Sequence, residues 1–90
     1  MGVSFFAGRI PQFKKMITVR AGIYRHNKTS RDYRVLGTAL HSETLETYVV
    51  YEALYENPKS KLWVRPLSLF TEIVAIDGKE VPRFEYVREA

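Results

Sequence analysis

The sequence predicts a mainly β protein, a small SH3-like barrel of five to six antiparallel strands with one short 3₁₀ turn. Two runs of apolar, β-branched and aromatic residues lie within residues 33–55. They alternate with polar residues at the period of a half-buried strand. Asp77-Gly78 is a strong hairpin turn signal. Residues 66–70 suit a single 3₁₀ turn, and no room remains for the longer helix of an OB-type barrel.

The predicted hairpin over residues 33–55 is the element around which the other strands fold. One face of its first run holds Tyr33, Val35, Gly37 and Ala39, and one face of its second run holds Val49, Tyr51, Ala53 and Tyr55. Glycine within a strand usually marks a bulge or a tight bend, so we expect one at Gly37. A helix over residues 43–54 is the alternative, which the β-branched and aromatic residues 47–51 disfavour.

The other elements follow in chain order. Residues 1–18 are an N-terminal extension whose structure the pattern leaves open, and residues 19–90 are the barrel domain. Within this domain we expect strands over residues 19–26, 62–65, 71–76 and 81–87, with a turn at 27–30 and a loop at 57–61. Pro66 stops the strand before it because it lacks a backbone donor, and Pro82 indicates an edge strand.

Composition excludes several classes of protein. The absence of cysteine excludes disulfides, thiolate zinc sites and cysteine nucleophiles, and it fits a reducing cytosol. We expect no membrane association, because no stretch approaches the roughly 20 apolar residues of a span and the first residues do not resemble a signal peptide. The net charge is +4, with +7 in residues 1–40 and −3 in residues 41–90. A basic segment favours phosphates or an acidic partner, although a solvated charged surface gives the same pattern.

Several short motifs occur in a fixed order along the chain. They include Gly22-Ile23-Tyr24-Arg25-His26, Tyr33-Arg34-Val35-Leu36-Gly37, His41-Ser42-Glu43-Thr44, Val49-Val50-Tyr51, Leu62-Trp63-Val64-Arg65-Pro66-Leu67, Asp77-Gly78-Lys79 and Val81-Pro82-Arg83-Phe84. With these motifs, residues 21–86 resemble domain of unknown function 1653, an uncharacterised bacterial family. The resemblance implies an SH3-like barrel and a bacterial, cytoplasmic protein. It implies no established activity.

Nine residues form the predicted ligand-binding site: Tyr24, Arg25, His26, Lys28, His41, Glu43, Tyr51, Trp63 and Arg65. Their aromatic and arginine side chains would form a recognition patch at the mouth of the barrel, as in domains that bind extended peptides. With Arg31 nearby, the same patch could stack bases and neutralise phosphates. The alternative is that Trp63 fills the core and Arg65 lies over it.

These residues predict a non-catalytic binding module for a nucleic acid, a peptide or a small anion, with no cofactor or metal. The second hypothesis is a homo-oligomeric structural or adaptor protein whose dimer contact lies within residues 5–17, where apolar side chains are frequent. The third is a metal-assisted hydrolase that uses His26, His41 and Glu43. The sequence favours a protein that is not an enzyme, since His41-Ser42-Glu43 are adjacent on the chain and no nucleophile-elbow motif is present.

Overall fold

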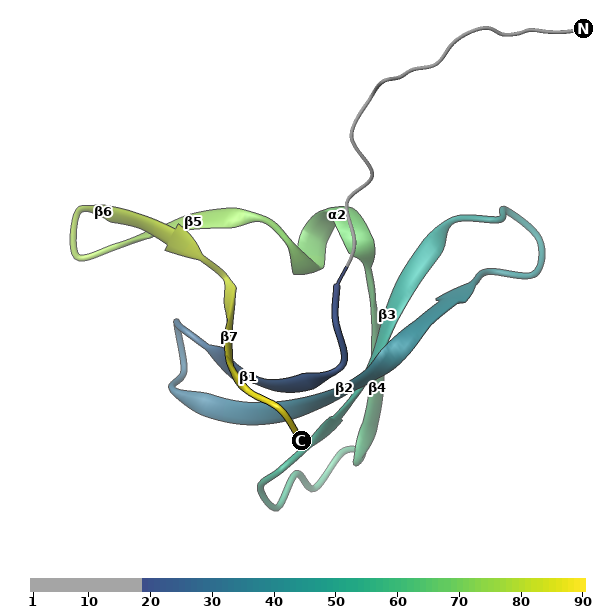
Figure 1. Cartoon of the computed structure of the whole chain (residues 1–90), viewed down its shortest axis with the longest axis horizontal. Coiled ribbons are helices and arrows are strands. Elements are labelled where there is room, and N and C mark those ends of the chain that lie inside the picture. Colours follow the sequence, from purple (N-terminus) through teal and green to yellow (C-terminus); the bar gives the residue numbers. More distant parts are fainter. Residues whose placement is uncertain (1–18) are drawn as a thin grey trace, which may run out of the picture.

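The computed structural model in Figure 1 describes residues 19–90, which form seven strands and one short helix. The strands are β1 (Gly22–His26), β2 (Arg31–Leu40), β3 (Thr47–Ala53), β4 (Leu62–Pro66), β5 (Ile73–Ile76), β6 (Lys79–Pro82) and β7 (Phe84–Arg88), and the helix is α2 (Leu67–Phe70). The prediction of a mainly β protein is confirmed. Within this part of the chain, no helix has the length and hydropathy needed to cross a membrane. The dimer contact predicted within residues 5–17 lies outside the described residues.

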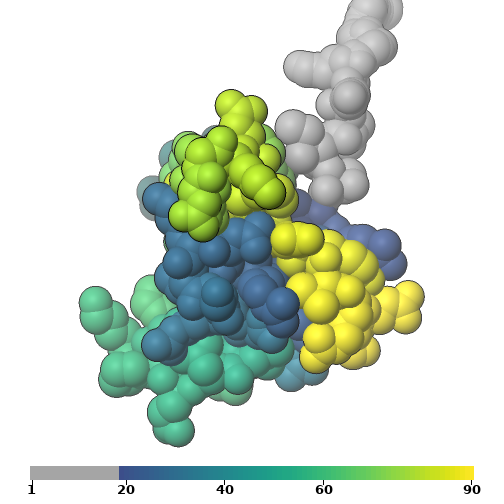
Figure 2. Space-filling view, turned by 90° about the vertical axis from the view of Figure 1, so that its left-hand side faces the viewer, coloured from purple at the N-terminus to yellow at the C-terminus, as the bar shows by residue number. Residues whose placement is uncertain are grey.

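The strands form two antiparallel sheets, a main sheet in the order β4-β3-β2-β1-β7 and a hairpin of β5 and β6. Figure 1 shows α2 over one face of the curved main sheet, with the β5–β6 hairpin extending to the side of the β1–β2 turn. In Figure 2, β7 (yellow) lies along the blue surface of β1 and β2, and the β5–β6 hairpin (yellow-green) projects above them. The two sheets are thus joined through α2 and through the short link from β6 to β7.

The main sheet does not close into the predicted barrel, because its edge strands β4 and β7 each pair with one neighbour only among the described strands. Pro66 ends β4, and the chain turns directly into α2. There the Phe70 ring stacks on Phe84 of β7, with centroids 4.1 Å apart and an interplanar angle of 7°. Side chains, not backbone hydrogen bonds, therefore fill the space between the two edges.

The central hairpin forms as predicted, with β2 paired to β3 from Tyr33 opposite Ala53 to Leu40 opposite Thr47. The bulge expected at Gly37 is present, since Val35 pairs with Tyr51 but Gly37 pairs with Val50. The bulge reverses the alternation. The prediction that Gly37 and Ala39 share one face with Tyr33 and Val35 was therefore wrong, and Ala39 is exposed.

Two other elements differ from the sequence prediction. The turn expected at residues 66–70 is α-helical and not 3₁₀, because the Thr71 N–H donates to the Leu67 carbonyl four residues earlier. The single strand expected over residues 81–87 is divided at Arg83, which gives seven strands where five to six were expected. The Arg83 N–H donates to the Glu72 carbonyl, and its own carbonyl accepts from the Asn27 N–H. These bonds turn the chain from the hairpin into the main sheet.

The core consists mainly of aromatic rings on the inner face of the main sheet. Its buried residues are Tyr24, Tyr33, Val35, Val49, Tyr51, Ala53, Phe70 and Phe84. The Phe70 ring also meets Tyr24 and Tyr51 edge to face, each with centroids 5.5 Å apart. Such pairs add to the free energy gained from burial alone. This packing fixes the inner face of β1, β2 and β3, from whose ends the polar side chains described next project.

Candidate functional site

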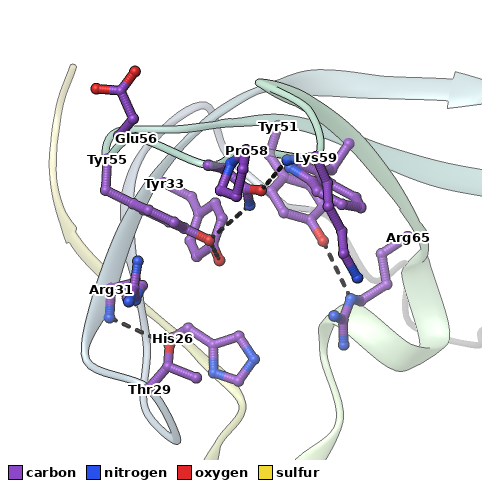
Figure 3. A pocket seen from close by; sticks show the side chains of 12 residues that line it. His26, Thr29, Arg31, Tyr33, Tyr51, Tyr55, Glu56, Pro58, Lys59 and Arg65 are labelled. Atoms are coloured by element: carbon purple, nitrogen blue, oxygen red, sulfur yellow. Dashed lines mark hydrogen bonds between the residues drawn. The ribbon is translucent and has the colours of Figure 1, made fainter.

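A pocket of roughly 530 Å³ lies between the β1–β2 turn and the β3–β4 loop. Its size falls within the approximate range of 300–1,000 Å³ typical of small-ligand sites. The lining residues, most of which are labelled in Figure 3, are His26, Thr29, Arg31, Tyr33, Tyr51, Tyr55, Glu56, Asn57, Pro58, Lys59, Trp63 and Arg65. They come from four strands and two connections, so the pocket exists only in the folded sheet.

The β3–β4 loop is shaped by hydrogen bonds from its own side chains. The Asn57 side-chain oxygen accepts from the Lys59 N–H at 3.0 Å, which is a common turn geometry for asparagine. The Asn57 amide nitrogen donates to the Tyr55 hydroxyl at 3.0 Å, and the hydroxyls of Tyr55 and Tyr33 lie 2.7 Å apart. This chain of bonds ties the loop to β2. One wall of the pocket is therefore held in place before any ligand arrives.

Three basic side chains extend into the pocket. The Arg31 guanidinium lies 4.3 Å from the centre of the Tyr55 ring, and Arg65 donates from Nε to the Tyr51 hydroxyl at 3.3 Å. In Figure 3, Lys59 and Arg65 extend toward the same part of the pocket, near that hydroxyl. Contact with aromatic rings holds a guanidinium in place without neutralising its charge.

These three cations lack carboxylate partners. Within residues 19–90, no ion pair includes Arg31, Lys59 or Arg65. Four of the five described arginines outside the pocket are paired, Arg88 being the exception: Arg20 with Glu89, Arg25 with Asp32, Arg34 with Glu52 and Arg83 with Glu72. Only one acidic residue, Glu56, belongs to the lining. The pocket lining therefore carries a net positive charge, with three cations that are unpaired within the described residues and one carboxylate.

His26 is a buried, neutral hydrogen-bonding group at the base of the pocket. Its Nδ1 accepts from the Lys28 N–H at 3.3 Å, which places the hydrogen of the neutral ring on Nε2. Burial lowers the pKa of His26, and the positive charges of Arg65 and Arg83 lower it further. The imidazole is thus a neutral donor at pH 7 and adds a further N–H to the pocket.

We expect the folded protein to lose stability as the pH falls below about 6.5 because of His26. Its pKa is below the ordinary value of 6.5 in the folded state, so the unfolded chain takes up the proton first. The stability that depends on the neutral ring is complete above pH 6.5 and is lost as the pH falls through the folded pKa. Urea unfolding across this window measures it.

His26→Gln should flatten this pH dependence. His41→Gln, which replaces the chain's other histidine at an exposed turn, is the matched control. A wild-type slope in the His26→Gln protein would contradict the assignment.

The structure brings four of the nine predicted site residues into one pocket: His26, Tyr51, Trp63 and Arg65. Lys28 lies beside them through its backbone bond to His26. Trp63 is half-buried, packs against the core and also lines the pocket, so it combines the two roles considered for it. Its Nε1 donates to the Ser60 carbonyl at 3.0 Å, which fixes the indole.

The other four predicted residues lie elsewhere. Tyr24 is in the core, edge-on to Tyr86, and Arg25 is exposed and paired with Asp32. His41 and Glu43 are in the β2–β3 turn, at the far end of the hairpin in Figure 1. There His41 Nδ1 accepts from the Glu43 and Thr44 backbone N–H groups. The set His26, His41 and Glu43 considered for a hydrolase is therefore not assembled, and within residues 19–90 no cluster of three or more His, Cys, Asp or Glu residues is suited to hold a metal.

The sequence interpretation missed most of the pocket wall. The residues it did not include are Thr29, Tyr33, Tyr55, Glu56, Asn57, Pro58 and Lys59, and it gave Arg31 only as a neighbour. One signal was available, since the Asn27-Lys28-Thr29-Ser30 turn places Arg31 opposite His26 in the register of β1 and β2. The position of the β3–β4 loop against the sheet has no such signal, because it depends on the contact between Tyr55 in the loop and Tyr33 on β2.

Comparisons with known proteins agree with this fold. The model of a family described as a protein of unknown function, DUF1653, matches residues 22–86. The chain is also similar to a crystal structure of a DUF1653 protein from Bordetella bronchiseptica, with 38% sequence identity and a TM-score of 0.75 over 80% of this chain and 91% of that one. No curated protein matches the chain significantly. The resemblance drawn from the sequence motifs is thus confirmed: the chain belongs to the DUF1653 family.

Proposed function

We propose that this protein is a non-catalytic binding module whose pocket takes an anionic ligand. One observation carries the proposal: Arg31, Lys59 and Arg65 extend into a pocket walled by tyrosines and have no carboxylate partners among the described residues. An uncompensated positive charge in a concave site focuses its field and raises the local concentration of anions. A pocket with these charges is therefore suited to bind an anion.

The pocket offers several hydrogen-bond donors to an anion at once. Arginine forms paired bonds to the oxygens of carboxylate or phosphate groups, and charge-assisted bonds of this kind are about twice as strong as neutral ones. The Tyr51 hydroxyl and the neutral His26 ring lie close to Arg65 and add uncharged donors. Because ring contacts and hydrogen bonds already hold these groups, little ordering is required when the ligand binds.

Among the ligand classes considered from the sequence, this lining favours an anion over a neutral peptide. A peptide groove of the SH3 type is built from aromatic faces that receive apolar side chains. Here the Arg31 guanidinium lies against the Tyr55 ring, 4.3 Å from its centre, so a cation accompanies this aromatic surface. Among the charged residues of the lining, Arg31, Lys59 and Arg65 are cationic and only Glu56 is acidic.

Tryptophan fluorescence tests the proposal directly, since Trp63 is the only tryptophan of the chain and lines the pocket. Titration with inorganic pyrophosphate at low salt should change its emission with saturation. Arg65→Gln and Lys59→Gln should each weaken binding by about tenfold or more, as expected for the loss of a charge-assisted hydrogen bond.

Two variants outside the pocket are matched controls. Arg88→Gln and Lys79→Gln remove the same charges from exposed positions on β7 and β6. They should weaken pyrophosphate binding by less than about threefold, because exposed charges at a distance are screened. The proposal is overturned if pyrophosphate leaves the emission unchanged and calorimetry detects no binding, or if the controls weaken binding as much as the pocket variants.

A further inference from the structure

We infer that the anionic ligand is a single-stranded nucleic acid that runs across two adjoining hollows. This inference rests on the proposed anion-binding function. A second hollow of roughly 460 Å³ adjoins the first at the β3–β4 loop and is lined by Ala53, Leu54, Tyr55, Glu56, Asn57 and Lys61. It shares Tyr55, Glu56 and Asn57 with the first pocket. A ligand longer than a small anion can therefore continue from one hollow into the other.

An aromatic ring stands at the boundary of the two hollows. Tyr55 is half-buried and lines both, and the exposed Arg31 guanidinium lies against its ring at 4.3 Å. Unpaired bases stack on tyrosine rings and on guanidinium planes, and this interaction tolerates any base sequence. The half-buried Trp63 indole adds a second planar surface in the first pocket. The site thus provides stacking surfaces where a ligand would pass.

Basic side chains are present in both hollows. Arg31, Lys59 and Arg65 line the first, and Lys61 lines the second. Lys61 is exposed and lies 3.9 Å from one oxygen of the buried Glu52, whose other oxygen is 2.6 Å from Arg34, so Arg34 is the closer partner of that carboxylate. Cations that are distributed over two adjoining hollows suit a polymer with one negative charge on each nucleotide. A compact anion would contact the cations of one hollow only. A positively charged groove combined with aromatic stacking is the usual design of single-strand binding sites.

Fluorescence anisotropy with a labelled, mixed-sequence single-stranded DNA of about eight nucleotides tests the inference. The competitors are inorganic pyrophosphate, AMP, the same DNA as a duplex, and an oligo-glutamate peptide of equal charge. We expect the single strand to bind at least tenfold more tightly than every competitor, and its affinity to fall steeply with salt.

The results separate this inference from the function on which it rests. If pyrophosphate binds but the single strand binds no more tightly than AMP, the anion pocket stands and the inference fails. If oligo-glutamate or the duplex binds as tightly as the single strand, the inference fails as well. If none of the probes binds, the proposed function itself fails.

Substitutions at the boundary provide a second, independent readout. Tyr55→Leu and Tyr55→Phe both lose the hydroxyl bonds to Tyr33 and Asn57 that hold the pocket wall, so the two variants are compared with each other. Only Tyr55→Leu removes the ring, and it should bind the single strand about tenfold more weakly than Tyr55→Phe, while their pyrophosphate affinities differ by less than about threefold. Lys61→Gln replaces an exposed cation. It should lower the slope of log affinity against log salt concentration for the single strand by about the amount expected for one phosphate contact, and it should leave pyrophosphate affinity unchanged. Wild-type single-strand binding by both Tyr55→Leu and Lys61→Gln overturns the inference, and thermal melting verifies that each variant is folded.

Discussion

Phe70→Ala is expected to lower the free energy of unfolding by about 3–5 kcal/mol. Phe70 is 1% exposed, stacks on Phe84 at 4.1 Å and meets Tyr24 and Tyr51 edge to face. Its removal leaves a cavity that rigid aromatic neighbours cannot fill, and it deletes the contact between α2 and β7. A small domain has a total stability of only about 5–15 kcal/mol, so much of the protein should unfold under mild conditions. Urea unfolding followed by circular dichroism measures the change.

Leu69→Ala is the matched control, because Leu69 precedes Phe70 in the same helical turn and is 47% exposed. Leucine and alanine are both good helix formers, so the local cost is small. We expect a loss below about 1 kcal/mol, as for most exposed positions. Equal losses for the two variants would show that the ring stack between α2 and β7 does not determine stability.

Gly22→Ala is expected to cost about 2–4 kcal/mol, from backbone strain and overpacking together. Gly22 has a φ of 147°, which side-chain-bearing residues rarely adopt. A methyl group there would lie 2.8 Å from Tyr86 Cε1 and 2.9 Å from the Arg88 carbonyl oxygen. The second contact is to backbone, so a side-chain rotation cannot relieve it, and the β1–β7 pairing must shift. Thermal and urea unfolding both report the loss.

Gly37→Ala separates the two causes. Gly37 has a similar φ of 155°, but an added methyl group would have no neighbour within 4 Å. This variant should show the backbone strain alone, about 1–2 kcal/mol. The difference between the two substitutions then measures the cost of the contacts with β7. If Gly37→Ala is as destabilising as Gly22→Ala, steric contact at Gly22 is not the cause.

The sequence was sufficient to predict the parts of the fold that depend on neighbouring residues. Alternation of apolar and polar residues predicted the pairing of β2 and β3, and the glycine at position 37 predicted the bulge. Asp77-Gly78 predicted the β5–β6 turn, in which both residues have the positive φ values, 53° and 78°, that such a tight hairpin requires. Each of these features is set by a few adjacent residues.

The open edge of the sheet could not be predicted in the same way. Whether β4 meets β7 depends on Phe70 and Phe84, which are distant in sequence and are brought together only by packing. The candidate site likewise has residues that the sequence indicates and residues that only tertiary packing brings into place. His26 and Arg65 could be proposed because charged or titratable groups on strands are conspicuous. The wall formed by residues 55–59 instead results from side-chain hydrogen bonds within the loop and from one contact to Tyr33 on β2. Neither the hydrophobic periodicity nor the composition of the sequence predicts such hydrogen bonds.

The pairing of β1 with β7 has a consequence for the order of folding. Ile23 lies opposite Arg88, so this contact joins positions near the two ends of the described chain, whereas β2 and β3 are joined by a short turn. Long-range contacts form more slowly than local ones, because a large loop must close first. His26 packs on Phe84 of β7, with ring centroids 4.6 Å apart. The candidate pocket therefore forms late in folding, and a chain that has formed only its central hairpin does not yet have it.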